Sequence, residues 1–493
     1  MFDDNRVVFH VDVNSAYLSW EAVYRLEHRG GSVDLREQVC AVGGDAAMRH
    51  GIILAKSLPA KRYGIRTGES IMEARQKCPE LQIVPPNYGL YEQCSARMMD
   101  ILREYTPDVE QYSIDEAFMD MTGTQALWGP PRAAAEALRQ RIFDELGFTV
   151  NVGVSSNKLL AKMASDFKKP NRVHTLFPEE VPSKMWPLPV ADLFFVGRVT
   201  AAKLHTLGIH TIGELARQDP AMLKYHLKKH GEVLWAFANG KDVSPVAPEP
   251  PANKGYGNST TISFDVTDAP MAKLVLLSLT EMVGTRLRSD GVCARVVSVT
   301  VKYDDLTSAG HQTTLMWGTN ITSELYGEAC QLFDQLWDGR PIRHLGVHTG
   351  QICRADGTRQ LSFVDTADYE RLALLDATVD RVRDRYGRDA LMRASFVRRS
   401  RPAAGAGGGM AVGAGAAARG VPGAGAGIEG GAAVGTGAAA RGVPGAGAGI
   451  GTGTAVGAGV AARTGAGTAR LEHMAGGVSR EKWTVDYSKV VVE

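Results

Sequence analysis

Three acidic side chains near the N-terminus have residue types and positions that suit metal-assisted phosphate chemistry. Asp12 follows the alternating apolar residues of VVFHVDV, and Asp115 and Glu116 stand together in YSIDEAF. Neighbouring carboxylates raise each other's pKa unless a cation is present. Oxygen ligands favour Mg²⁺, and two such ions can activate a hydroxyl group and hold a leaving phosphate. The spacing alone also fits a structural explanation, in which Asp12 caps a turn and the acidic dipeptide fills an exposed hairpin.

The elements that would position these acids follow from apolar spacing and from prolines. VVFHVDV predicts a strand that ends near Asp12, VEQYSIDEAFMDMT predicts two strands joined by a tight turn, and TVNVGV predicts another strand. A helix over residues 90–105 should end before Pro107, and the helix in NKLLAKMASDF should end by Pro170. Because strands and helices are interleaved, we expect a mixed sheet with its helices on one side.

The middle of the chain has two further units. VTAAKLHTLGIHTIGELA predicts two short helices joined by a glycine turn, and the Pro-rich segment SPVAPEPPANKG follows as a linker. A compact α+β unit is predicted beyond it, with strands in STTISFDV, VVSVTVKY, HQTTLMWG and VHTGQICR and helices in KLVLLSLTEMVGTRLRSDG and ITSELYGEACQLFDQLWDG. From Tyr369 to Arg388 we expect a charged amphipathic helix, with these apolar residues on one face: Leu372, Leu375, Val379 and Val382.

Residues 403–470 differ from the rest of the chain because they are almost entirely Gly and Ala. A segment beginning AVG recurs at Ala411, Ala433 and Ala455, so the repeat has a period of 22 residues. A period of this length can indicate a solenoid. Too few bulky apolar residues are present to form a core, so we expect a disordered, flexible linker followed by a tail at 471–493.

Bulk composition indicates a multi-domain protein and leaves the partner open. The chain has 493 residues, and 55 Lys and Arg balance 54 Asp and Glu to a net charge of +1. The six cysteines form no C-x-x-C pair, which is compatible with a reducing compartment. We see no signal-peptide pattern and no apolar run of about 18 residues. These features predict a cytoplasmic protein that does not contact a membrane.

Several long motifs together resemble the Y-family DNA polymerases of the DinB/UmuC group. The motifs are HVDVNSAYLSWE, YSIDEAFMDMTG, GVSSNKLLAKMASDFKKPN, PLPVADLFFVGRVTAAKLHTLGIHTIGELA and RPIRHLGVHTGQI, and they occur in the order found in that family. They span residues 5 to about 400, so the Gly/Ala-rich segment lies outside the resemblance. The resemblance implies an α+β multi-domain protein shaped as a right-hand polymerase.

The resemblance also implies a domain order along the chain. We expect a palm with a mixed sheet and helices, then fingers, a helical thumb of helix–hairpin–helix type and an α+β little finger. The expected boundaries are these: palm 1–14 and 79–168, fingers 15–78, thumb 169–242, linker 243–255, little finger 256–357, and a clamp-binding-like peptide with a helix at 358–402.

Catalytic and metal-binding roles carry over to the acidic motifs. Asp12 and Asp115 resemble the family's ligands for two Mg²⁺ ions, and the backbone carbonyl of Val13 resembles a further ligand. Glu116 resembles the second acid of the pair and would help to hold the metal near the primer hydroxyl.

Nucleotide selection is implied for Tyr17, which stands where the family places a steric gate against the ribose 2′ hydroxyl. Ala16 replaces the aromatic residue usual in DinB-type members, so the floor of the pocket should be smaller. Tyr17 could instead be a core tyrosine on a short helix.

Triphosphate binding is expected at Lys158, because a lysine near the start of a helix suits an anionic tail. A solvated surface lysine is the alternative. In ILAKSLPAKRYGIRTGES, Leu58 and Lys61 stand where the family usually has a Tyr and an Arg. Lys61 can neutralise a phosphate, but it lacks the bidentate geometry of arginine.

Two further motifs imply contacts with DNA and with a protein partner. In the thumb motif, Phe195 stands where the first glycine of a phosphate-binding G-x-G belongs and only Gly197 remains, and the two helices could simply pack together. RQLSFVD resembles a sliding-clamp peptide with anchors at Gln360, Leu361 and Phe363, although an ordinary loop would also explain it.

The favoured hypothesis is a monomeric, template-directed DNA polymerase that takes primer–template DNA and deoxynucleotides. It should lack proofreading, copy with low fidelity and bypass damaged bases. The alternatives are a non-catalytic adaptor for another polymerase and a generic metal-dependent nuclease. The intact acidic triad argues against the adaptor, and the Tyr17 and Lys158 motifs argue against the nuclease.

Overall fold

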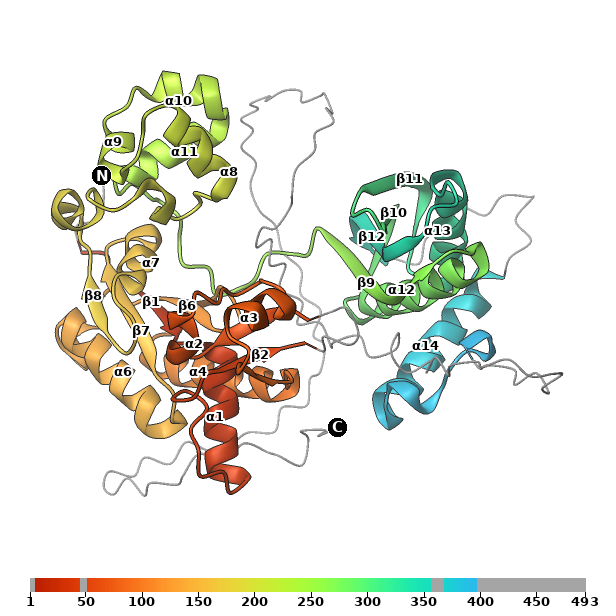
Figure 1. Ribbon diagram of the computed structural model, residues 1–493, viewed down its shortest axis with the longest axis horizontal. Coiled ribbons are helices and arrows are strands. Elements are labelled where there is room, and N and C mark those ends of the chain that lie inside the picture. The colour runs from red at the N-terminus through yellow and green to blue at the C-terminus, as the bar shows by residue number, and fades with distance from the viewer. Residues whose placement is uncertain (1–4, 45–50, 356–367, 397–493) are drawn as a thin grey trace, which may run out of the picture. The chain divides into compact units, whose positions relative to one another are not determined.

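A computed structural model describes residues 5–44, 51–355 and 368–396 of the chain (Figure 1). The expected clamp-peptide anchors Gln360, Leu361 and Phe363 lie outside these ranges, as do the Gly/Ala-rich segment 403–470 and the tail 471–493. Within the described ranges, no helix is long and apolar enough to cross a membrane.

A five-stranded mixed sheet forms the centre of the N-terminal part. Its strands lie in the order β5 (Val109–Gln111), β6 (Glu116–Asp120), β1 (Val8–Val13), β7 (Val150–Ser155) and β8 (Val173–Thr175). Only β7 and β8 pair in parallel, and the other neighbours are antiparallel. The strands predicted from VVFHVDV, VEQYSIDEAFMDMT and TVNVGV are therefore confirmed.

Helices cover both faces of this sheet, so the prediction of helices on one side was wrong. α7 (Lys158–Asp166) packs on the face that carries His10 and Gly153, where a Cβ on Gly153 would lie 1.9 Å from the Ala161 carbonyl oxygen. Residues of the opposite parity, such as Phe9 and Val11, are also fully buried. Since α6 (Pro131–Leu146) also contacts β7, the second face is covered too. The alternating apolar pattern could not reveal this, because His10, Asn151 and Gly153 fill the α7 face.

Further helices flank the sheet. α4 (Tyr88–Tyr105) begins at an Asn87 side chain that accepts a hydrogen bond from Leu90, and it ends before Pro107 as predicted. α1 (Ala16–His28) follows β1 and packs against α4, and the short α5 (Gln125–Trp128) precedes α6. The start of α1 therefore places residues just downstream of Asp12 beside α4.

A smaller three-stranded sheet forms the fingers region. β3 (Ile53–Lys56), β2 (Cys40–Gly43) and β4 (Gln82–Val84) lie in that order, with β4 parallel to β2. α2 (Leu58–Arg62) and α3 (Ile71–Lys77) complete the unit around a small apolar cluster. β4 joins this sheet although it lies beyond residue 78, in the segment expected for the palm.

The segment expected for the thumb is helical, and its apolar core is shared with α7. Its helices are α8 (Arg198–Thr206), α9 (Ile212–Ala216), α10 (Pro220–Leu227) and α11 (Lys229–Ala238). Gly208 has φ +75 and turns the chain between α8 and α9, as the sequence predicted. The Thr211 side chain caps α9 and Glu214 completes the capping box.

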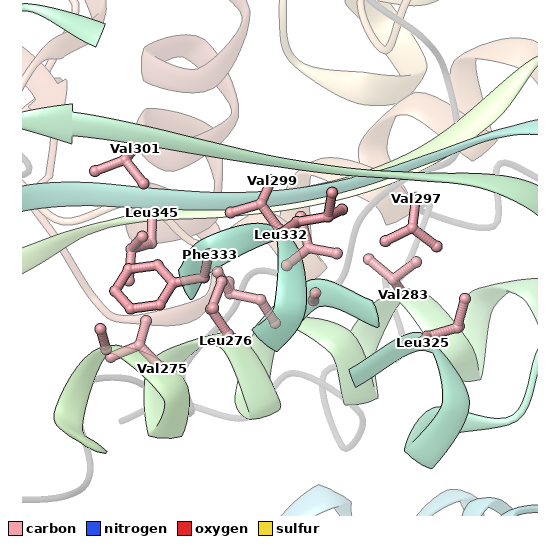
Figure 2. Packing of buried hydrophobic residues seen from close by; sticks show 14 of the residues in the cluster. Val275, Leu276, Val283, Val297, Val299, Val301, Leu325, Leu332, Phe333 and Leu345 are labelled. Carbon is pink, nitrogen blue, oxygen red and sulfur yellow. The ribbon is translucent and has the colours of Figure 1, made fainter. Parts of the chain in front are cut away.

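The predicted α+β unit is confirmed, element by element, in residues 255–354. Its sheet has the order β11 (Ser308–Thr319), β10 (Val292–Tyr303), β12 (Ile342–Arg354), β9 (Gly255–Val266). α12 (Ala269–Ser289) and α13 (Thr322–Leu336) cover one face. Figure 2 shows Val297, Val299 and Val301 of β10 pointing toward Phe333 and the helices.

α14 (Tyr369–Tyr386) is the helix expected between Tyr369 and Arg388, and its packed side includes three residues of the predicted apolar face, namely Leu372, Val379 and Val382, but not Leu375. Leu375 is exposed, whereas Asp376 is buried. Asp376 accepts a hydrogen bond from the backbone of Thr322 at 2.7 Å and pairs with Arg288 at 3.2 Å. The helix therefore docks through polar contacts to α12 and α13, which apolar periodicity cannot detect.

Candidate active site

The three acids of the sequence prediction lie on adjacent strands of the central sheet. Asp12 is directly opposite Glu116 in the antiparallel register of β1 and β6. The backbone of Val13 donates a hydrogen bond to the carbonyl of Asp115 at 3.0 Å, so the turn before β6 is fixed to the end of β1. The fold therefore brings residues more than a hundred positions apart into one acidic cluster.

Burial raises the pKa of two of these carboxyls. It raises the pKa of Asp12 to about 7, although Lys169 lowers it through an amine that lies 2.9 Å from Asp12 Oδ2. Burial likewise raises the pKa of Asp115, and the Ser113 hydroxyl donates a hydrogen bond to it at 2.7 Å. A nearby cation would lower the pKa of both carboxyls, because it stabilises the ionised form.

The pKa of Glu116 is shifted in the opposite direction, below its ordinary value. Burial raises the pKa of Glu116, but the interaction with Lys162 lowers it, and the net pKa lies well below the usual range. The Lys162 amine lies 2.8 Å from Glu116 Oε1.

His10 lies behind Glu116 and is fully buried. Burial lowers its pKa to about 4, so its ring is neutral. Ser165 Oγ donates to the Lys162 carbonyl and must therefore accept from His10 Nδ1 at 2.8 Å. His10 Nε2 lies 3.8 Å from Glu116, which is too long for a hydrogen bond.

The acidic cluster has the donor chemistry of a site for a hard divalent cation. Asp12 offers a buried carboxylate and Asp115 a half-buried one, and Glu116 is held ionised beside them. In the ranges that the structure describes, no three His, Cys, Asp or Glu side chains converge as a preformed cage. Lysine amines contact Asp12 and Glu116, so a metal would exchange with these amines. Mg²⁺ commonly binds through one or two carboxylates and keeps waters and substrate phosphates as other ligands.

The lysines that contact the acids differ from Lys158, which the sequence had singled out. Lys158 Nζ lies 2.7 Å from both carboxylate oxygens of Glu110, on β5, and 3.4 Å from the Pro245 carbonyl. Lys162 and Lys169 contact Glu116 and Asp12 instead. Their signal in the sequence was the KLLAK spacing, which places Lys158 and Lys162 one helical turn apart, and the KKPN segment after α7.

Tyr17 is held in an aromatic cluster at the start of α1. Its ring stacks on that of Tyr91 with centroids 4.5 Å apart and 13° between the planes, and Tyr88 approaches edge-on at 6.2 Å. The Tyr91 hydroxyl donates to the buried Glu21 at 3.1 Å. Burial raises the pKa of Tyr17, and so does the charge of Asp115. The Tyr17 ring therefore lies within electrostatic reach of the acidic cluster. Ala16, the preceding residue, is small and buried.

The fingers residues flagged by the sequence lie on the short helix α2. Leu58 is exposed at its start and Lys61 is exposed in its last turn. The Ser57 side chain caps this helix by accepting from Ala60 at 3.1 Å. Leu58 has no polar group with which to bind a phosphate, whereas the Lys61 amine is a flexible hydrogen-bond donor.

The thumb turn before α8 keeps a glycine-like conformation without the glycine. Phe195 has φ +71, in the left-handed region that favours glycine, and its side chain is exposed. Gly197 then serves as the N-cap of α8, with no side chain to occupy the first amides of the helix.

Comparisons with known proteins agree with this fold. Three parts of the impB/mucB/samB family description match: the main region at residues 11–166, the HHH motif at 178–209 and the C-terminal domain at 253–363. A solved Y-family DNA polymerase chimera of Dbh and Dpo4 has a TM-score of 0.61 and 23% identity, and the match covers 71% of this chain and 99% of that one. The chain is thus a right-hand, Y-family-like α+β protein.

Curated relatives show to which family the chain belongs. The DNA polymerase IV of Clostridium acetobutylicum is 43% identical over 390 residues, which cover 79% of this chain and 98% of the relative. That of Acetivibrio thermocellus is 40% identical over 387 residues, covering 78% and 95%. The chain belongs to the impB/mucB/samB family. Membership implies a dependence on divalent metal ions and use of DNA and nucleotide substrates.

Proposed function

We propose that this chain is a template-directed DNA polymerase that adds deoxynucleotides to a primer 3′ end and copies past damaged template bases. The observation that carries this proposal is the Asp12–Glu116 register across β1 and β6, with Asp115 one residue away, in a chain of the impB/mucB/samB family. No separate proofreading activity is proposed. Low fidelity on intact template is proposed from the open site of the family, which would also allow bypass of damaged bases.

Two Mg²⁺ ions, when bound, would supply activation of the primer hydroxyl and stabilisation of the leaving pyrophosphate. Asp12, Asp115 and the Val13 carbonyl are the proposed ligands, and Glu116 is the further acid near the primer end. The residues of the chain do the positioning. Asp12 and Asp115 lie on elements joined by the Val13–Asp115 hydrogen bond, and Lys162 keeps Glu116 ionised.

Lys169 is the proposed ligand for the triphosphate, in place of Lys158. Its amine already lies at the acidic cluster, where the nucleotide's metal-bound phosphates would arrive. When metal replaces Lys169 at Asp12, the freed ammonium can bind a phosphate oxygen. Lys158 contacts Glu110 and the linker carbonyl of Pro245. Lys61 of α2 is a second proposed phosphate ligand.

Tyr17 is proposed as the gate that excludes a ribose 2′ hydroxyl. The Tyr91 stack fixes the orientation of its ring, which a gate requires. Ala16 enlarges the adjoining space, so we expect tolerance of altered bases together with retained selection of the sugar.

DNA is proposed to bind the thumb turn at Gly197 and the open face of the little-finger sheet. That face carries residues opposite in parity to the buried valines of β10. Its members from β10 and β12 include Ser298, Thr300, Lys302, His344 and His348. Such polar contacts hold DNA largely without regard to sequence.

A sliding clamp is the proposed protein partner, through Gln360, Leu361 and Phe363, and the polymerase is proposed to act as a cytoplasmic monomer. The adaptor alternative is less favoured, because Asp12, Asp115 and Glu116 are all present.

Primer extension tests the proposed function. The full chain, with Mg²⁺, should extend a primer on intact and on lesion-bearing templates, and a chelator should abolish the extension. The Asp115→Ala variant should likewise show no extension at matched protein concentration. Extension by that variant at the wild-type rate would reject the mechanism. Asp144→Ala, an exposed acid on α6, is the matched control and should retain activity.

A further inference from the structure

An exposed phenylalanine occupies the turn that leads into α8. Phe195 has φ +71 and is 55% exposed. A side chain in this region is strained, because its Cβ crowds the following carbonyl oxygen. Residues held in such conformations often mark functional positions. The turn therefore presents a large ring where a glycine would be easier to accommodate.

Two neighbouring rings pack against Phe195. Its centroid lies 4.3 Å from that of Phe194 and 5.8 Å from that of Phe237. Phe194 and Phe237 are partly buried against the thumb core. Part of the Phe195 side chain is thus supported by the domain, and more than half of it is exposed to solvent.

A surface groove of about 360 Å³ adjoins this turn. Val196, Ala201 and Ala202 contribute apolar walls, and Arg198 and His205 contribute basic groups. Gly197 also lines the groove, and none of the described residues that line it is acidic. Apolar walls suit deoxyribose rings, and an arginine suits phosphate oxygens. A sugar–phosphate strand therefore matches this groove better than an apolar peptide does.

We propose that Phe195 packs its ring against the sugar face of a duplex DNA strand whose phosphate lies at Gly197 and Arg198. The inference rests on the proposed function and deepens it, since it adds an aromatic contact to the thumb's phosphate grip. Phe195 lacks the backbone freedom of a glycine at this position, but its ring adds an apolar contact with DNA. Support from Phe194 and Phe237 limits the entropy that this ring loses on binding.

The test measures binding of a fluorescent primer–template duplex by the full chain at fixed salt. Phe195→Gly suits the backbone of the turn and removes the ring. We expect it to keep the wild-type thermal stability and weaken duplex binding about tenfold, because the apolar contact of the ring with the sugar is lost. Phe195→Asn, which also tolerates positive φ, should weaken it similarly. Phe195→Trp should stay within about threefold of wild type, because it keeps an aromatic face.

Two control variants separate this inference from the proposed function. Tyr225→Ala removes another exposed thumb aromatic, on α10, and should leave binding unchanged. Arg198→Gln tests the phosphate grip itself. Loss of binding with Arg198→Gln but not with Phe195→Gly overturns the ring contact and leaves the groove as a DNA site. No loss with either variant overturns both, and a wild-type chain that binds no duplex overturns the proposed function.

The kind of DNA contact is tested with a single strand of the same length. Packing on a sugar face of the duplex predicts that Phe195→Gly weakens duplex binding more than single-strand binding. An equal loss on both would mean stacking on unpaired bases and would overturn the proposed contact.

Discussion

Asp12 and Lys169 form an ion pair with 2.9 Å between Oδ2 and Nζ, although 157 positions separate them in the chain. Lys169 also pairs with Asp166 at the end of α7. The charges of Asp12 and Asp166 keep the pKa of Lys169 above its usual value despite burial, which acts to lower it. The amine is therefore a fixed positive charge beside the proposed metal ligand.

Lys169→Ala should lower kcat/KM for deoxynucleotides about 10–100-fold, because the triphosphate no longer meets a positive charge there. Lys158→Ala should change kcat/KM less than about threefold, since its partners are Glu110 and Pro245. Single-nucleotide insertion kinetics compare the two variants directly. Equal decreases would contradict the assignment of the phosphate-binding role to Lys169. Thermal unfolding of both variants controls for loss of fold.

Tyr17→Ala should raise ribonucleotide incorporation relative to deoxynucleotide incorporation by roughly 10–200-fold, the range expected when a fitted pocket is changed at one side chain. The measurement is the ratio of kcat/KM values for matched nucleotides. Tyr91→Phe keeps the stack on Tyr17 and removes only the hydroxyl that donates to Glu21, so it should retain sugar selection. Unchanged sugar selection in Tyr17→Ala would reject the gate.

The sequence predicted the strands around the acids because alternation and proline positions are local signals. It also predicted the family, because ordered motifs extend over most of the chain. It did not predict which lysine meets which acid. That choice depends on α7 crossing the sheet at Gly153 of β7, where the Ala161 carbonyl leaves no room for a side chain. Lys162 consequently points to Glu116, and the chain after α7 brings Lys169 to Asp12.

α14 shows a second limit of sequence reasoning. Its apolar spacing predicted Leu375 on the packed face, yet Asp376 is the buried residue. The partners that stabilise Asp376, namely Arg288 and the first turn of α13, come from distant segments. A buried carboxylate of this kind follows from tertiary contacts and not from helical periodicity.

The free energy of unfolding of Glu21→Gln, relative to that of the wild type, should be larger at neutral pH than at pH 4. Burial raises the pKa of Glu21 above its ordinary value of 4.5, so the folded state holds this proton more tightly than the unfolded state does. The wild type therefore loses stability as the pH rises from about 4.5 through the folded pKa. Gln cannot ionise and can still accept from Tyr91. Urea unfolding from pH 4 to pH 8 measures the effect, and a pH-independent difference between the two proteins would contradict it.

Arg288→Met should destabilise the little finger by about 3–5 kcal/mol, because it removes the guanidinium that contacts both Asp376 and Asp380. Arg288 contacts Asp376 at 3.2 Å and Asp380 at 2.6 Å, and its side chain is only 13% exposed. Arg340→Met is the matched control, since Arg340 pairs with Asp338 on the surface and its loss should change the free energy of unfolding far less. Urea unfolding gives both free energies, and limited proteolysis reports release of α14. Equal, small costs for the two variants would show that the Arg288 pairs do not hold α14 in place.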